Sequence, residues 1–321
     1  MENNVFIFPG QGSQYVGMGK ELAYNFSSAR RVFEMADEAL GRKLSDIIFS
    51  GTEDELRLTE NTQPAIVAVS IACLEVLREH GLEASAAAGL SLGEYSALIS
   101  AGSMSVSDAL PLVQKRGRYM QEAVPPGVGG MAALLGLERS KVIESCLLAS
   151  DTGVVEPANY NSPDQIVISG EITAVRRACE IAKGMGAKRA VELPVSVSFH
   201  CSLLKSVEPR LARDLEAVDV LTAKMPVVAN ISADYITSPS QIRTALIFQV
   251  SNAVLWQDSM EKLIRDGYNT FIEVGPGKAL TGLMKKINPN VWVHQVEDRK
   301  SLEKVLSSLD GKEGENFGFG G

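Results

Sequence analysis

Short apolar runs alternate along the chain with longer stretches whose apolar residues recur at helical spacing. Four of these runs are bounded by polar or turn-forming residues and predict short buried strands: Val5–Phe8, Val227–Ile231, Thr270–Val274 and Val291–His294. Helices are predicted between them, among others at 17–40 and 64–80, the latter with Pro64 at its start and Gly81 just past its end. Strands that alternate with helices are typical of an α/β fold with a mostly parallel sheet.

The middle of the chain has a different order of predicted elements. It begins with Pro125-Pro126-Gly127-Val128-Gly129-Gly130, a composition typical of a hinge. The pattern then predicts strand, helix, strand, strand, helix and strand, at Met131–Leu137, 138–150, Val154–Tyr160, Gln165–Ser169, 172–185 and Lys188–Val195. The order βαββαβ is that of a ferredoxin-like unit. We therefore expect a large domain formed by 1–126 and 198–310, an inserted subdomain formed by 127–197, and a ligand cleft between them.

Composition narrows the class of protein. Of the 321 residues, 45% are hydrophobic and 22% are charged, which is ordinary for a soluble globular protein. The net charge of −8 argues against a general nucleic-acid binder, and no apolar run is long enough to span a membrane. We expect no signal peptide, and the four scattered cysteines indicate reduced thiols in a cytoplasmic protein without a metal site. The glycine-rich end, 311–321, is expected to be disordered.

The pentapeptide Gly89-Leu90-Ser91-Leu92-Gly93 follows a predicted strand of small residues and precedes a predicted helix. A GxSxG sequence in this setting is typical of a nucleophile elbow, a sharp turn that exposes the serine hydroxyl. The hydroxyl of Ser91 would then lie at a helix N-terminus, where free backbone N–H groups can stabilise an oxyanion. Many serines in such a pattern are ordinary loop residues, so a structural role for Ser91 stays open at this point.

An arginine occupies an apolar helical face. Arg116 lies in the predicted helix 107–122, four residues from both Leu112 and Met120, on the side that should be buried. A guanidinium there is costly unless it meets an anion. That anion is either an acidic side chain of the protein or the carboxylate of a ligand, which an arginine can hold with two hydrogen bonds.

Three histidines could activate a serine. His200 ends the run Val195–His200, whose alternation predicts a strand with Ser198 and His200 on its polar face. His294, in a late apolar strand, is the alternative base. His80 lies at a helix C-terminus, where a cation is favoured without any catalytic role.

Two weaker signals lie outside the elbow. Gln11 lies in the glycine-rich turn 9–14 after the first strand, where its amide could face a ligand or cap the next turn. This turn and a second one at 275–277 match neither GxGxxG nor the phosphate-binding GxxxxGK[ST] pattern, so no nucleotide site is expected. Lys285 and Lys286 form a basic cluster that is either a solvated helix face or a docking site for an acidic protein.

Six segments, taken together and in this order, resemble the malonyl-CoA:acyl carrier protein transacylases of bacterial type II fatty-acid synthesis. They are PGQGSQ (9–14), GLSLGEYSAL (89–98), QKRGRYMQ (114–121), ANYNSPDQIVISG (158–170), SFHC (198–201) and EVGPGKALTGL (273–283). The resemblance implies an α/β-hydrolase-like large domain with a mostly parallel sheet and an inserted ferredoxin-like subdomain. It also implies malonyl transfer from malonyl-CoA to the phosphopantetheine thiol of acyl carrier protein, in a ping-pong reaction without metal or other cofactor.

The resemblance implies a Ser-His dyad. Ser91 matches the acyl-accepting serine of the family and His200 its base. Gln249 matches the residue whose backbone carbonyl orients the histidine. A hydrolase triad would instead need an acidic orienter.

Further roles come from the same resemblance. Arg116 matches the arginine that binds the malonyl carboxylate, and Gln11 with the backbone N–H of Leu92 matches the oxyanion hole. Leu90 is a departure, because many members have histidine there. Phe199 resembles the malonyl-selective members, whereas methylmalonyl-selective relatives usually have serine.

Other functions remain open on the sequence alone. They are a trans-acting malonyltransferase of polyketide synthesis, a serine thioesterase or esterase, and a non-catalytic acyl-binding protein. We expect a monomer with neither a nucleic-acid nor a membrane partner.

Overall fold

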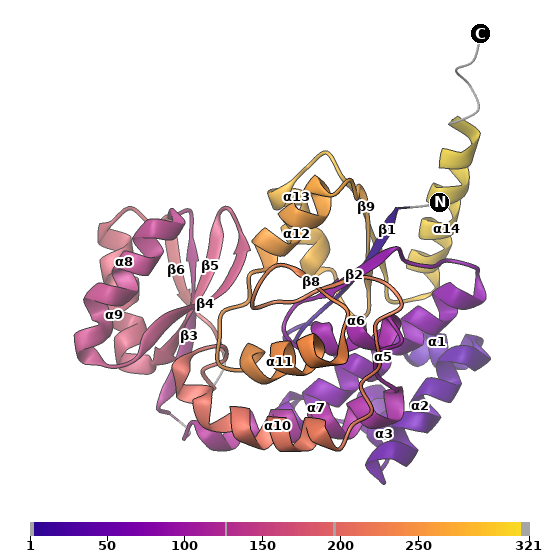
Figure 1. Ribbon diagram of the computed structural model, residues 1–321, viewed down its shortest axis with the longest axis horizontal. Helices are drawn as coiled ribbons and strands as arrows, with labels where there is room; N and C mark the ends of the chain where they lie inside the picture. Colours follow the sequence, from indigo (N-terminus) through magenta and orange to yellow (C-terminus); the bar gives the residue numbers. More distant parts are fainter. Residues whose placement is uncertain (1–2, 126, 195–196, 316–321) are drawn as a thin grey trace.

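A mostly parallel sheet forms the centre of the larger part of the molecule, as predicted. The computed structural model describes residues 3–125, 127–194 and 197–315 (Figure 1). The sheet has six strands in the order β10-β9-β1-β2-β7-β8. Their bounds are β1 Asn4–Phe8, β2 Ala86–Gly89, β7 Val227–Val228, β8 Tyr235–Ile236, β9 Thr270–Val274 and β10 Trp292–Val296. All neighbouring strands pair in parallel except β7 and β8.

Helices cover both faces of this sheet (Figure 1). The helices of this part are α1 Lys20–Asn25, α2 Ser27–Leu40, α3 Leu44–Ser50, α4 Glu53–Arg57, α5 Thr59–Glu79, α6 Gly93–Ser100, α7 Val106–Ala123, η2 Ser202–Val207, α10 Glu208–Glu216, α11 Pro239–Gln249, α12 Trp256–Arg265, α13 Ala279–Ile287 and α14 Arg299–Glu315. Phe6 and Phe8 of β1 pack in the same cluster as α5, whereas Val5 and Ile7 pack in a second cluster with α12 and α13. Burial on both faces explains why the strands read as continuous apolar runs.

The middle of the chain forms a second, antiparallel sheet. Its elements are β3 Gly129–Leu135, α8 Arg139–Ala149, η1 Ser150–Thr152, β4 Val155–Ser162, β5 Gln165–Glu171, α9 Ile172–Gly184 and β6 Arg189–Glu192. The strands lie in the order β4-β5-β3-β6, and every pair is antiparallel. This is the βαββαβ arrangement that the sequence pattern predicts, with its own apolar core beneath α8 and α9.

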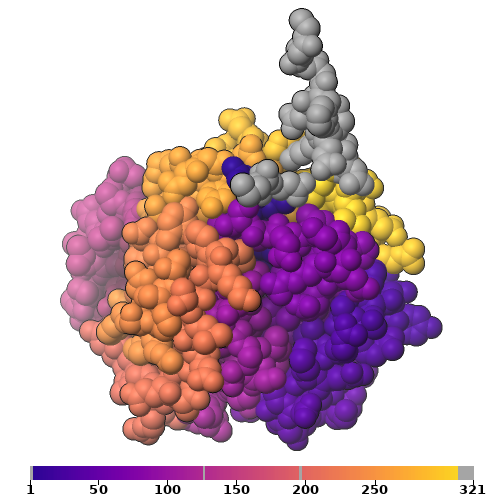
Figure 2. Space-filling model, turned by 45° about the vertical axis from the view of Figure 1, so that its right-hand side comes forward, coloured from indigo at the N-terminus to yellow at the C-terminus, as the bar shows by residue number. Residues whose placement is uncertain are grey.

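Hydrogen bonds and an ion pair join the part of the molecule built on the parallel sheet to the part built on the antiparallel sheet. The N–H of Val254 donates to the Ala158 carbonyl at 2.8 Å, and the N–H of Tyr160 donates to the Val254 carbonyl at 2.9 Å, so β4 has a partner from the large part. Arg139 of α8 pairs with Asp258 of α12 at 2.9 Å. In the space-filling view, the N-terminal and C-terminal thirds of the chain lie side by side and the middle segment lies beside the C-terminal third (Figure 2).

The ends of β1 and β2 meet the start of α6 at very short range. A Cβ atom at Gly93 would lie 2.1 Å from the Phe8 carbonyl oxygen, and one at Gly89 would lie 1.9 Å from the carbonyl carbon of Gly93. The N–H of Leu90 donates to the Phe8 carbonyl at 3.0 Å. Any side chain at the two glycines would push strand and helix apart, so the close turn around Ser91 depends on both of them.

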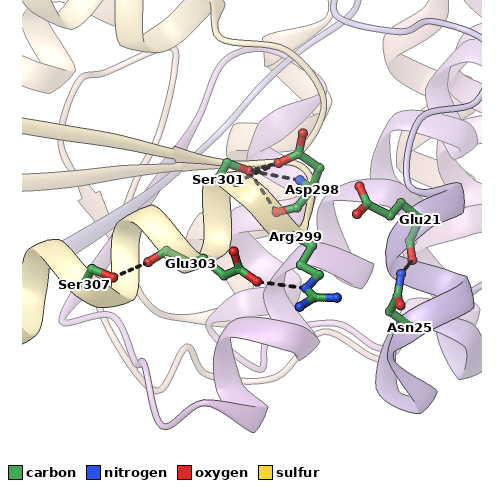
Figure 3. Close-up of polar contacts among 7 residues, drawn as sticks. All are labelled: Glu21, Asn25, Asp298, Arg299, Ser301, Glu303 and Ser307. Carbon is green, nitrogen blue, oxygen red and sulfur yellow. Dashed lines mark hydrogen bonds and ion pairs between the residues drawn. The ribbon is translucent and has the colours of Figure 1, made fainter.

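Two sequence expectations need correction. The last helix, α14, continues to Glu315, so residues 311–315 are helical where disorder was expected, and 316–321 lie outside the described residues. Its first turn is fixed by Asp298, whose carboxylate accepts from the N–H of Ser301 at 2.7 Å, and Arg299 pairs with Glu303 at 2.8 Å (Figure 3). The strand expected at Val195–His200 is absent over the described residues 197–200.

The close turn generates a stability prediction. Gly93→Ala should lower the free energy of unfolding by about 2 kcal/mol or more, because the new methyl group overlaps the Phe8 carbonyl. Gly282→Ala is the matched control: its Cβ meets nothing within 4 Å on α13, and the change should raise stability by about 0.5–1 kcal/mol. Urea unfolding of both variants measures the difference. Equal stability of the Gly93 variant and the wild type would contradict the assigned packing.

Candidate active site

Ser91 is held in an unusual backbone conformation between β2 and α6. Its φ is +54°, in the left-handed region that residues with a side chain rarely adopt. Asn230, just past β7, stabilises this turn from both sides. Its side-chain oxygen accepts from the Ser91 N–H at 2.6 Å, and its side-chain nitrogen donates to the Gly89 carbonyl at 2.7 Å. The elbow geometry expected for GxSxG is therefore present, with Ser91 partly exposed at its tip.

His200 contacts the hydroxyl of this serine. Its Nε2 lies 2.6 Å from Ser91 Oγ, and its Nδ1 lies 2.8 Å from the backbone carbonyl of Gln249. Because a carbonyl only accepts, Nδ1 carries the proton and Nε2 is free to accept from the hydroxyl. Burial, together with the charge of Arg116, lowers the pKa of His200 to about 4. The imidazole is therefore neutral near pH 7, the form that can act as a base.

The position of His200 arises differently from the expected strand. His200 has φ +59° and lies in a turn directly before η2, rather than at the end of alternating residues. Ser198, expected on the same polar face, instead accepts from the Gly130 N–H at 2.9 Å and donates to the Gly170 carbonyl at 2.6 Å. These bonds fasten the segment before His200 to β3 and β5. Phe199 is partly buried between apolar groups of both parts of the molecule.

Arg116 is fully buried on α7 and has no carboxylate among its hydrogen-bond partners in the described chain. One terminal nitrogen donates to Gln63 Oε1 at 2.9 Å, and the other donates to Gln249 Oε1 at 2.9 Å and to Ser91 Oγ at 3.4 Å. Its Nε has no partner among the described residues. Sequence analysis left open an acidic side chain or a ligand carboxylate as the partner of Arg116. Among the described residues no acidic side chain bonds to it directly, and its guanidinium lies beside the serine hydroxyl.

A buried carboxylate lies behind these groups. Glu94, in the first turn of α6, accepts through Oε2 from the side-chain nitrogen of Gln249 at 2.7 Å and from the Asn230 N–H at 3.1 Å. Burial raises its pKa to about 7, although the two hydrogen bonds and the charge of Arg116 oppose this. Gln249 also donates to the Ser91 carbonyl at 2.9 Å.

The loop after β1 lies against the elbow. A Cβ at Gly10 would be 2.5 Å from the Leu90 carbonyl oxygen, which brings the Gly10–Gln11 turn next to Ser91. Gln11 is partly exposed in this turn. Leu92 is buried at the N-cap of α6, where backbone N–H groups have no partner inside the helix. Both residues thus lie near the tip of the elbow: Gln11 in the loop after β1, and Leu92 directly after Ser91.

Other candidate residues lie elsewhere. His294 lies on β10, which β9 and β1 separate from β2, and the Nδ1 of His80 lies 2.8 Å from the Val76 carbonyl at the end of α5. Lys285 and Lys286 are exposed on α13, and Lys286 pairs with Asp164 of the small sheet's turn at 3.2 Å. In the described part of the chain, no three His, Cys, Asp or Glu side chains are arranged to hold a metal ion.

Three buried residues of the site were missed by sequence reasoning: Gln63, Glu94 and Asn230. Glu94 had a readable signal, because it is the single charged residue in the apolar helix that follows the elbow. Gln63 was placed before a helix that was expected to begin at Pro64, whereas α5 begins at Thr59 and carries Gln63 inside it. Asn230 follows a short strand and had no signal that distinguished it from other polar residues at strand ends.

Comparison with known proteins gives a consistent picture. Residues 5–302 match the family described as acyl transferase domain. The chain is 46% identical over 310 residues to the malonyl CoA-acyl carrier protein transacylase of Bacillus subtilis (strain 168), covering 96% of this chain and 98% of that protein. It is 44% identical over 307 residues to the protein of the same name from Escherichia coli (strain K12), covering 95% and 99%.

Solved structures agree with the sequence relatives. The malonyl CoA-acyl carrier protein transacylase of Clostridium perfringens superposes with a TM-score of 0.94 at 46% identity, covering 97% of this chain and 98% of that one. A malonyl-transacylase in complex with a type II PKS acyl-carrier protein superposes with a TM-score of 0.93 at 41% identity, covering 96% and 100%. The chain therefore belongs to the acyl transferase domain family, and within it to the malonyl CoA-acyl carrier protein transacylases.

Proposed function

We propose that this enzyme transfers a malonyl group from malonyl-CoA to the phosphopantetheine thiol of acyl carrier protein through a malonyl ester on Ser91. The observation that carries the proposal is the juxtaposition of a nucleophile and a buried cation. Ser91 Oγ lies 2.6 Å from His200 Nε2 and 3.4 Å from the guanidinium of Arg116. An acyl group attached to Ser91 would therefore extend beside Arg116 and favour a carboxylate at its far end.

In the first half-reaction, His200 Nε2 takes the proton of Ser91 as Oγ attacks the thioester carbonyl of malonyl-CoA. The resulting oxyanion is stabilised by the Leu92 N–H and the side chain of Gln11, and one such donor contributes about 3–4 kcal/mol to lowering the barrier. The carbon–sulfur bond then breaks. The coenzyme A thiolate takes the proton from His200, and the malonyl group remains on Ser91.

The second half-reaction repeats these steps with another thiol. His200 takes the proton of the phosphopantetheine thiol, the sulfur attacks the malonyl ester, and Ser91 leaves with that proton. Each step exchanges one acyl–heteroatom bond for another without a change of oxidation state. The proposal therefore needs neither a redox cofactor nor a metal ion.

The partner of His200 Nδ1 supports a transferase over an esterase or thioesterase. It is the backbone carbonyl of Gln249 at 2.8 Å, rather than the carboxylate that orients the histidine in a hydrolase triad. Carriers of fatty-acid and of polyketide synthesis are both candidate acceptors, because one of the similar structures holds a type II PKS acyl-carrier protein.

Ser91→Ala should abolish covalent loading. Intact-mass spectrometry after mixing with malonyl-CoA should show one malonyl adduct on the wild type and none on the variant, because among the described residues no other hydroxyl has the His200 contact. Adding holo acyl carrier protein should move the adduct to the carrier. An adduct that persists in the variant, for example on the buried Cys201, would contradict the assignment, and free malonate without an adduct would indicate a hydrolase.

Arg116→Ala should weaken malonyl loading at least tenfold while acetyl loading changes little, because a charged hydrogen bond to the carboxylate contributes about 2 kcal/mol. Loading rates with malonyl-CoA and acetyl-CoA measure the selectivity. Arg118→Ala is the matched control on the same helix, since Arg118 is half-exposed, pairs with Glu122 at 3.8 Å and lies over the ring of Tyr119, away from Ser91. Equal losses for both thioesters would mean that Arg116 is structural.

We propose Lys285, with Lys286, as part of the surface that docks the acidic carrier. Lys285→Glu should raise KM for acyl carrier protein and leave KM for malonyl-CoA unchanged, and added salt should reduce the difference. Lys285 is the better residue to change, because Lys286 also holds Asp164. Lys20→Glu, an exposed charge reversal on α1, is the control. An unchanged KM for the carrier would remove this cluster from the docking surface.

A further inference from the structure

A single buried carboxylate holds two amide residues of the proposed site. Glu94 has no exposed surface, and its Oε2 accepts from the Gln249 side chain at 2.7 Å and from the Asn230 N–H at 3.1 Å. Gln249 belongs to α11 and Asn230 follows β7, so one oxygen joins segments far apart in the chain. The other oxygen, Oε1, has no hydrogen-bond partner in the part of the chain that the structure describes.

Each of the two amide residues then holds reacting groups. Gln249 offers its backbone carbonyl to His200 Nδ1 at 2.8 Å and its side-chain oxygen to Arg116 at 2.9 Å. Asn230 accepts from the N–H of Ser91 at 2.6 Å. Ser91, His200 and Arg116 thus each bond to a residue, Asn230 or Gln249, that Glu94 itself holds.

The contact with Glu94 fixes the orientation of the Gln249 amide. A side-chain amide has a donor end and an acceptor end, and a carboxylate can only accept while an arginine can only donate. The NH₂ of Gln249 must therefore face Glu94 and its oxygen must face Arg116. The Ser91 carbonyl, which accepts from the same NH₂ at 2.9 Å, favours the same orientation, and without the carboxylate the amide loses the stronger of its two acceptors.

We propose that Glu94 is a positioning residue that sets Ser91, His200 and Arg116 in one geometry through Gln249 and Asn230. It acts through these amides and does not touch the substrate. The inference rests on the proposed function, because it assigns Glu94 a part in the loading of Ser91.

The charge of Glu94 bears on this role. Charge-assisted hydrogen bonds are roughly twice as strong as neutral ones, so the ionised carboxylate holds the two amides best. The charged or titratable groups that act on it are Arg116 on α7 and Tyr95 in its own helix. Burial raises the pKa of Glu94 to about 7, whereas that of His200 is lowered to about 4. Loading should therefore gain rate as pH rises through about 7, where His200 is already neutral.

The test is Glu94→Gln, which keeps the shape and one acceptor oxygen but removes the charge. Glu273→Gln is the matched control, because Glu273 is also fully buried, accepts from two backbone N–H groups of α13 at 3.0 and 2.7 Å, and has a pKa raised by burial. The rate constant and dissociation constant of malonyl loading are measured by quenched-flow from pH 5 to 9. Labelling by phenylmethanesulfonyl fluoride, a serine reagent without a carboxylate, is measured in parallel.

Glu94→Gln should load malonyl about tenfold to a hundredfold more slowly at pH 8, with a similar dissociation constant for malonyl-CoA. Its sulfonyl labelling should also slow, and the rise in rate near pH 7 should disappear. Glu273→Gln should keep both rates and the wild-type pH profile. Wild-type rates, an unchanged pH profile or unaffected sulfonyl labelling in Glu94→Gln would each overturn the proposal.

Thermal unfolding separates positioning from a loss of fold. The folded-state pKa of Glu94, about 7, exceeds the ordinary carboxyl value of 4.5, so the wild type loses stability as pH rises between these values. Glu94→Gln has no such loss, and its Tm relative to the wild type should be more favourable at pH 8 than at pH 5. If the wild type forms no malonyl adduct yet reacts with the sulfonyl fluoride, the proposed function fails, and the sulfonyl rates alone decide the role of Glu94.

Discussion

The left-handed backbone of Ser91 is the constraint on which the rest of the site depends. A φ of +54° costs free energy for a residue with a side chain, and it persists because the surroundings leave no alternative. Glycines at 89 and 93 let β2 and α6 approach the end of β1 to within contact distance of the backbone, and Asn230 bonds both to the Ser91 N–H and to the Gly89 carbonyl. The hydroxyl is thereby fixed beside His200 before any substrate arrives.

Electrostatics explain why a carboxylate-bearing acyl group suits this site. A buried guanidinium with only neutral hydrogen-bond partners retains much of its desolvation cost. The buried carboxylate of Glu94, on the other side of the Gln249 amide, offsets part of the positive charge of Arg116. Burial of His200 itself keeps its imidazole neutral. The groups form one coupled set: Arg116 lowers the pKa of His200, and Gln249 contacts both.

Much of the fold follows from the pattern of residues, and less of the site does. Apolar runs bounded by turn formers, together with stretches at helical spacing, predict most strands of both sheets, and β9 has the predicted bounds. The two-residue strand β8 was not predicted. The strand predicted before His200 is wrong because the position of this segment depends on hydrogen bonds of Ser198 to β3 and β5, which no local pattern encodes. Gln63, Glu94 and Asn230 come from three distant segments, so their meeting is a property of tertiary packing. The last helix, α14, continues to Glu315 although disorder was expected from 311, and its first turns are anchored by the Asp298 cap and the buried Leu302 and Val305.

The central claim is that Ser91 carries the malonyl group as a stable intermediate. Rapid mixing of the enzyme with malonyl-CoA in the absence of carrier, followed by measurement of free coenzyme A, tests it most directly. The account predicts a burst of one equivalent of coenzyme A per chain, then almost no further release until carrier is added. Steady release without a burst limit, or no release at all, would contradict it.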